Sequence, residues 1–161
     1  GARGDGSRRD RVVAAIDYAG IRSQLKTLLE ADARLAGVRV YVEEEPQIGL
    51  SDVQKAIAVF TDTRVAVADQ SMSAGKRTRY NLRTSLWTVF FDMTSYSAAC
   101  DGRDGVLAQL ELVLMDNRTL GGKVTASWLE GGELFSARSP QGNTFVAAAE
   151  TVLVSEVSAI N

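Results

Sequence analysis

Two apolar stripes with helical spacing open the chain, and glycines separate and end them. Gly20 lies between the stripes, so the helix is expected to bend or restart there. Asp10 is expected to cap the helix at its start, and Gly37 to end it. The first stripe comprises Val12, Val13 and Ile16, and the second comprises Tyr18, Ile21, Leu25, Leu28 and Leu29.

The apolar period then changes to two residues, which predicts strands. In residues 38–43, three valines alternate with Arg39, Tyr41 and Glu43, a pattern typical of a half-buried strand. The acidic stretch that follows contains a proline and a glycine and predicts a loop. Residues 57–67 alternate again, and one long strand or a hairpin turning at Asp62 would both fit.

Residues 80–93 predict a long central strand whose apolar positions change parity. They are even up to Leu86 and odd from Trp87 onward. A β-bulge would produce this change by adding one residue and turning the strand over. Burial of both faces of the strand would produce it as well.

A second helix is predicted after this strand, with Asp101 or Asp104 as its cap. It would end at Asn117, before a Gly-Gly pair, and residues 123–129 would then form a strand. We interpret residues 146–157 as a last strand paired with the preceding one, although their alanines leave a helix open. The helix is indicated by a stripe comprising Val106, Leu107, Leu110, Val113 and Leu114.

This order of elements predicts an α+β fold, with a mostly antiparallel sheet and two main helices packed on one face. The other face would be solvated or covered by a partner. Because Tyr41, Phe60 and Phe90 fall on the parity expected to face solvent, the pattern favours an oligomer. The expected organisation is a disordered basic arm over residues 1–9 and a single α+β domain over residues 10–161.

The composition of the chain argues against several kinds of functional site. The chain has 161 residues, with 18 basic and 20 acidic side chains, and its net charge of −2 argues against a dedicated nucleic-acid binder. It has no histidine and one cysteine, Cys100, so the commonest general base, the commonest metal ligand and an internal disulfide are all missing. We expect no enzyme, no cofactor and no metal site. No apolar run approaches the length of a membrane span.

A cluster of positive charges stands directly before the central strand. It is not a nucleotide-binding loop, because Gly75 and its lysine are followed by arginine and the earlier glycine position holds Gln70. A patch that binds a partner and a solvated loop are both possible explanations, and for the cluster as a whole we favour the patch. The cluster comprises Lys76, Arg77, Arg79 and Arg83.

The order of elements resembles that of the tail terminator and tail completion proteins of long-tailed bacteriophages. The resemblance extends from about Asp10 to the end of the chain. It rests on the strand "VRVYVEEEP", the strand "RTSLWTVFFDM", the helix "GVLAQLELVLMDN" and a closing pair of strands. It is a resemblance of pattern, because these families have no invariant catalytic motif to compare.

The resemblance implies a structural virion protein rather than an enzyme. Such a protein forms a ring, usually a hexamer, at the head-proximal end of the tail tube, where it ends tube polymerisation. Its partners would be itself, the tail tube protein, and a neck or head-completion protein, with DNA passing through the channel without sequence-specific contact and no membrane involved. It would be located in the tail or neck of the virion after assembly in the host cytoplasm.

Two other functions stay open at this stage. One is a head-closure or neck connector protein of the same particle. The other is a nucleic-acid-binding module that uses the basic residues, with Tyr80 and Trp87 as stacking surfaces.

In a ring, the basic cluster would contact an acidic rim or face the DNA channel. Three acids, Glu43, Glu44 and Glu45, are candidates for the opposing surface on the next subunit. A solvated acidic loop is the simpler explanation of these three residues. Exposed ion pairs contribute only about 0–1 kcal/mol each, so apolar burial would supply most of the assembly energy.

Overall fold

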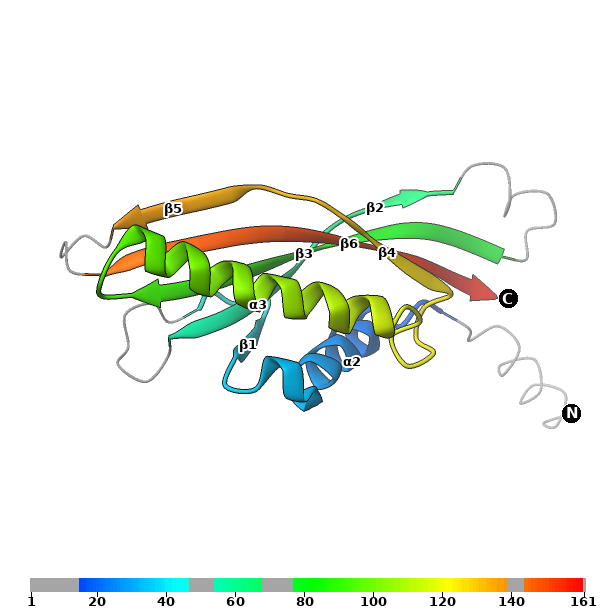
Figure 1. The fold of residues 1–161 in the computed structure, drawn as a ribbon. Helices are drawn as coiled ribbons and strands as arrows, with labels where there is room; N and C mark the ends of the chain where they lie inside the picture. Colours follow the sequence, from blue (N-terminus) through cyan, green and yellow to red (C-terminus); the bar gives the residue numbers. More distant parts are fainter. Residues whose placement is uncertain (1–14, 47–53, 68–76, 139–143, 161) are drawn as a thin grey trace, which may run out of the picture.

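The computed structural model describes residues 15–46, 54–67, 77–138 and 144–160. In these residues a six-stranded sheet carries both α-helices on one face, which confirms the predicted α+β class (Figure 1). The predicted arm over residues 1–9 lies outside the described residues. In chain order the elements are α2 (Tyr18–Ala31), the 3-10 helix η1 (Ala33–Leu35), β1 (Arg39–Val42), β2 (Lys55–Ala66), β3 (Arg77–Asp92), α3 (Tyr96–Asp116), β4 (Ala126–Glu130), β5 (Leu134–Arg138) and β6 (Phe145–Ile160).

The sheet has the strand order β1-β2-β3-β6-β4, and β5 pairs with the other half of β6. Its centre is the antiparallel pair β3 and β6, which runs without interruption from Arg77 opposite Ile160 to Asp92 opposite Phe145. Strands that neighbour each other in the sheet pair antiparallel, except for β1 and β2, which are parallel. Parallel strands need a connection that brings the chain back to the same end of the sheet, and in the sequence residues 43–54 lie between β1 and β2.

The parity change in β3 arises because both faces of this strand are buried, not from a bulge. Leu82 and Leu86 belong to the core beneath the helices, whereas Val89 and Phe91 belong to a second cluster on the opposite, helix-free face. The irregularity in the sheet lies in β2 instead, where Asp62 is the extra residue between two pairs with β3. β2 is therefore one strand with a bulge rather than a hairpin.

The three aromatic residues that were expected to face solvent are buried or half-buried instead. Tyr41 is only 7% exposed and belongs to the helix-free cluster, and Phe60 packs half-buried against it. Phe90 lies on the helix face, against α3. The helix-free cluster includes the alanines of neighbouring strands, Ala56, Ala58 and Ala148. Small side chains beside large rings leave space for the rings to lie over the sheet, and this accounts for the burial without a covering helix.

Within the described residues, the first helix is α2, which begins at Tyr18. Asp17 caps α2 by accepting a hydrogen bond from the Gly20 backbone N–H at 2.9 Å, while Asp10 lies outside the described residues. Gly20 therefore sits in the first turn, where a Cβ atom would collide with the Asp17 carboxylate. The helix ends at Ala31, and Gly37, with φ at +81°, follows the short 3-10 turn instead of ending α2 directly.

The second helix begins five residues before Asp101, so the predicted caps are wrong. Ser95 is the cap, and its Oγ accepts a hydrogen bond from the Ala98 N–H at 3.1 Å. Asp101 and Asp104 lie inside the helix. The predicted end at Asn117 is confirmed, since this residue caps α3 and its Nδ2 donates to the Val113 carbonyl at 2.8 Å.

The last segment is a strand, as interpreted from the sequence. Its alanines, which had left a helix open, are buried in the sheet at Ala147, Ala148 and Ala149. Tyr96 of α3 contacts the Phe145 ring edge-on, and the Arg103 guanidinium of α3 reaches the Ala148 carbonyl at 3.4 Å. The side chains of Ala147 and Ala149, on the helix face, therefore lie where α3 packs closely on the sheet.

Candidate assembly surfaces

The predicted basic cluster is divided by the structure. Lys76 lies outside the described residues, and Arg77 begins β3. Arg79 and Arg83 lie within β3 rather than in a loop, and both fall on the odd parity that faces away from the helices. From Arg77 onward the cluster is thus part of a rigid strand in the centre of the sheet.

Acids from β6 and β4 already pair with Arg79 and Arg83. Arg79 forms an ion pair with Glu156 of β6. The Arg83 Nη2 atom lies 2.6 Å from Glu130 Oε2 of β4, and this hydrogen bond raises the pKa of the Arg83 guanidinium. Beside them, Ser85 Oγ donates to Glu150 Oε2 at 2.7 Å.

These six residues form a polar ladder across β3, β6 and β4, consisting of Arg79, Arg83, Ser85, Glu130, Glu150 and Glu156. The ladder contains two cations and three carboxylates. Arg79 and Arg83, with the acids beside them, therefore do not present a net positive surface.

The three predicted acids also separate into two kinds. Glu43 has φ at +57°, and its backbone N–H donates to the Val59 carbonyl at 2.8 Å. Its Oε1 atom accepts from the Thr61 N–H at 2.6 Å, so Glu43 turns the chain away from β1 and attaches it to β2. Glu44, in the same bend as Glu43, and Glu45, directly after it, are exposed.

Of the two stacking surfaces suggested by the sequence, Tyr80 is covered and Trp87 is half-buried. The Arg64 guanidinium lies 4.5 Å from the Tyr80 ring centre and 5.5 Å from that of Tyr18, and it donates to the Tyr18 hydroxyl. Trp87 packs against the helix-free cluster. The Tyr80 ring is therefore covered by Arg64, whereas Trp87 keeps part of its surface exposed on the helix-free face.

Exposed apolar side chains gather along the sheet edge formed by β4 and β5. Trp128 is 41% exposed, Leu134 65% and Phe135 52%. Sequence analysis missed β5, because a five-residue strand with an almost fully exposed pattern carries no burial signal. We call Ala126–Arg138 the open edge, since in the described residues β4 and β5 pair only with β6.

A hollow of about 200 Å³ adjoins the β4 half of this edge. It lies at the end of α3 and is mainly apolar. Its lining comprises Leu114, Met115, Arg118, Ser127, Trp128, Leu129 and Leu153.

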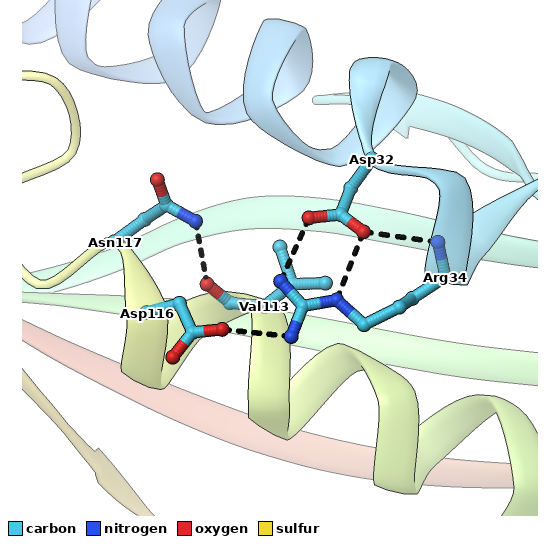
Figure 2. A network of polar contacts seen from close by, with 5 residues as sticks. All are labelled: Asp32, Arg34, Val113, Asp116 and Asn117. Atoms are coloured by element: carbon cyan, nitrogen blue, oxygen red, sulfur yellow. Dashed lines mark hydrogen bonds and ion pairs between the residues drawn. The ribbon is translucent and has the colours of Figure 1, made fainter.

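A polar network between η1 and the end of α3 holds these two elements together (Figure 2). The Arg34 guanidinium lies 2.9 Å from Asp32 and 2.7 Å from Asp116. The hydrogen bonds that Arg34 donates from its side chain and backbone lower the pKa of Asp32 from 3.8 to about 2. The two carboxylates in turn raise the pKa of Arg34.

We expect replacement of Asp32 by asparagine to lower the melting temperature at pH 7. Because the pKa of Asp32 is lower in the folded state, ionised Asp32 stabilises the fold fully above pH 3.8 and loses this effect as the pH falls towards about 2. The difference in melting temperature between wild type and variant should therefore shrink from pH 7 to pH 3 in scanning calorimetry. A difference that is equal at both pH values would contradict this role of the carboxylate.

Within residues 15–46, 54–67, 77–138 and 144–160, no group of three or more His, Cys, Asp or Glu side chains could hold a metal ion. In the same residues, no helix combines the length and apolarity that crossing a bilayer requires.

The sequence matches no known family, and its structure has a distant similarity to one kind of particle. No protein-family model matches the chain, and no curated protein matches it. Among solved structures, it is similar to a chain of the "Virion of native gene transfer agent (GTA) particle", with 13% sequence identity and a TM-score of 0.37. That match covers 88% of this chain and 99% of the other. A TM-score of this size is below that of chains sharing a fold.

Proposed function

We propose that the protein is a structural component of a phage-like virion that acts by assembly rather than by catalysis. More specifically, it forms a ring at the head-proximal end of a tail, ends polymerisation of the tail tube and joins the tail to the neck. The observation that supports an assembly role best is the open edge, where Trp128, Leu134 and Phe135 expose large apolar surfaces beside strand edges that no other described residue pairs with. Exposed apolar surface of this kind is typical of protein interfaces.

The arrangement of elements supports the resemblance to tail terminator proteins. The amphipathic helix, the acidic turn at Glu43, the long strand β3 and the helix that follows it are all present in the expected order. The closing pair of strands is β4 and β6, with β5 as an additional short strand between them in sequence. In this proposal the partners are further copies of the chain, a tail tube protein and a neck or head-completion protein.

The charge distribution is compatible with DNA passing through such a ring. Arg79 and Arg83 are paired with acids, and the ladder has more carboxylates than guanidinium groups. Weak attraction to phosphates would let DNA move, whereas a row of unpaired cations would hold it. The same pairing weighs against the nucleic-acid-binding alternative.

Deletion of the gene from the genome that encodes it tests this proposal. We expect tail tubes of variable and excessive length that are not joined to heads, since nothing would end polymerisation. The measurement is the distribution of tail lengths in negative-stain micrographs, with the wild-type gene supplied in trans as the control.

Normal-length tails joined to filled heads would overturn the proposal. Normal-length tails beside heads that have lost their DNA would indicate the head-closure alternative instead.

A further inference from the structure

The open edge has a sequence that reads almost the same in both directions. Residues 126–137 are ASWLEGGELFSA, and the centre of this palindrome lies between Gly131 and Gly132. Five of the six matched positions are identical, and the sixth matches Trp128 with Phe135, which are both aromatic. The identical matches are Ala126 with Ala137, Ser127 with Ser136, Leu129 with Leu134, Glu130 with Glu133, and Gly131 with Gly132.

A palindromic strand is complementary to itself in antiparallel pairing, because each residue then meets its own kind. Within one chain the two halves do not meet, since β4 and β5 lie in line along β6 (Figure 1). Ala126 pairs with Glu156 and Ala137 with Val146, ten residues apart on β6. At roughly 3.3 Å per residue, the two alanines are about 33 Å apart.

The backbone of the open edge is arranged for a further strand. The Glu150 N–H donates to the Glu133 carbonyl at 2.8 Å, so Glu133 faces β6. In an antiparallel ladder alternate residues face the same neighbour. Leu134 and Ser136 therefore direct their backbone groups away from β6.

In β4, too, alternate residues direct their backbone groups towards β6 and away from it. Between β4 and β5 the open edge has one residue more than β6, at the Gly-Gly step. Residues 131–133 oppose only residues 150–151, because Glu130 pairs with Val152 and Leu134 with Ala149. On β6, Val152 and Val154 face the open edge as Glu150 does. Their partners on β4, Glu130 and Trp128, direct their backbone groups towards β6. Ser127 and Leu129 therefore direct theirs away from β6.

We propose that the open edge pairs with the same edge of a second copy of this chain, around a two-fold axis between Gly131 and Gly132. The two sheets then join into one, with their helices on the same side. In this register Ser127 meets Ser136 of the other copy and Leu129 meets Leu134, which are the residues whose backbone groups face outward. Trp128 meets Phe135, and both lie on the helix-free face because each pairs with an even residue of β6.

The palindrome specifies this register, and the outward backbone groups and the side-chain faces both agree with it. A shift by one residue would place Trp128 and Phe135 on opposite faces of the joined sheet. The pairing also covers the exposed apolar side chains of the open edge.

Two acidic side chains face each other in this contact and oppose it. The register brings Glu130 of one copy opposite Glu133 of the other, and like charges directly opposite each other weaken strand pairing. Arg83, 2.6 Å from Glu130, supplies a positive charge on the same face. A contact between two copies through one shared patch ends with a dimer. It is therefore a property of the free protein, and in this dimer the open edge is not available for contacts in a ring.

Cysteine cross-linking tests the register. In a Cys100→Ala background, we expect Ala126→Cys together with Ala137→Cys to give a disulfide-linked dimer under mild oxidation, read on a non-reducing gel. Opposed residues of a pair without mutual backbone hydrogen bonds have Cα atoms about 4.5 Å apart, within the range that a disulfide spans. Each single-cysteine variant is the matched control and should stay unlinked, since copies of one position lie far apart across the axis.

Two outcomes would overturn the proposal. A disulfide within the monomer would show that β4 and β5 form a local hairpin. Thiols that stay reduced would show that the open edge pairs neither with itself in this way nor with a second copy.

A charge-reversal variant tests the same register without cysteines. Glu133→Lys should tighten the dimer about tenfold in sedimentation equilibrium, because two like-charge pairs become opposite-charge pairs. An unchanged or weaker dimer would contradict the register.

Discussion

Replacing Gly102 with alanine will lower the free energy of unfolding, whereas the same replacement at Gly105 will raise it. The two glycines lie three residues apart in α3. A Cβ atom on Gly102 would lie within 2.5 Å of three carbons of the Phe90 ring, and one on Gly105 would meet nothing within 4 Å. The expected opposite signs follow from this difference in surroundings.

The magnitudes come from two competing effects. Alanine is more favourable than glycine in a helix by about 0.8–1.0 kcal/mol, and both variants gain this amount. Forcing an extra group into a packed core costs about 1–3 kcal/mol, and only the Gly102 variant has this cost. We therefore expect a difference of about 1–3 kcal/mol between the two variants.

Urea unfolding followed by circular dichroism measures both changes. A smaller side chain at residue 90 should restore stability to the Gly102 variant, so Gly102→Ala combined with Phe90→Leu should lose less than the sum of the single changes. If both alanine variants are equally stable, or if the effects of Gly102→Ala and Phe90→Leu add, the close contact between Phe90 and α3 is wrong.

Phe90 also shows how far hydrophobic patterning predicts this fold. The stripes of α2 and α3, the central position of β3 and the α+β class follow from the sequence, because each depends on periodicity within one element. Phe90 was assigned to the wet face because the parity of apolar residues changes at Trp87. When both faces of a strand are buried, periodicity no longer tells which side chain faces the helices.

The candidate surfaces are harder to predict because they depend on register between distant strands. Arg79 pairs with Glu156, 77 residues away, and Arg83 pairs with Glu130, 47 residues away. A cluster of cations in sequence gives no sign that acids will lie beside it on neighbouring strands. The short strand β5 is invisible to burial patterns, although the palindrome that contains it can be read from the sequence.

A second large effect is expected from a buried hydroxyl in β3. Thr88 is fully buried, and its Oγ1 atom has no hydrogen-bond partner among the described residues. Leaving a buried polar group unpaired costs about 1–3 kcal/mol. Valine has nearly the same shape as threonine and favours strands, so Thr88→Val should raise the free energy of unfolding by about 1–2 kcal/mol. The measurement is the midpoint of urea unfolding, which should rise with an unchanged slope.

Ser85, three residues earlier in the same strand, should behave in the opposite way. It is also buried, but its Oγ donates to the Glu150 carboxylate at 2.7 Å. Ser85→Ala removes this bond to a charged group and should lower stability by about 1–3 kcal/mol. If Thr88→Val is destabilising as well, its hydroxyl must have a partner in solution, such as a bound water. If both variants are stabilising, the polar ladder contributes nothing to the fold, and its charges would then be available to a partner.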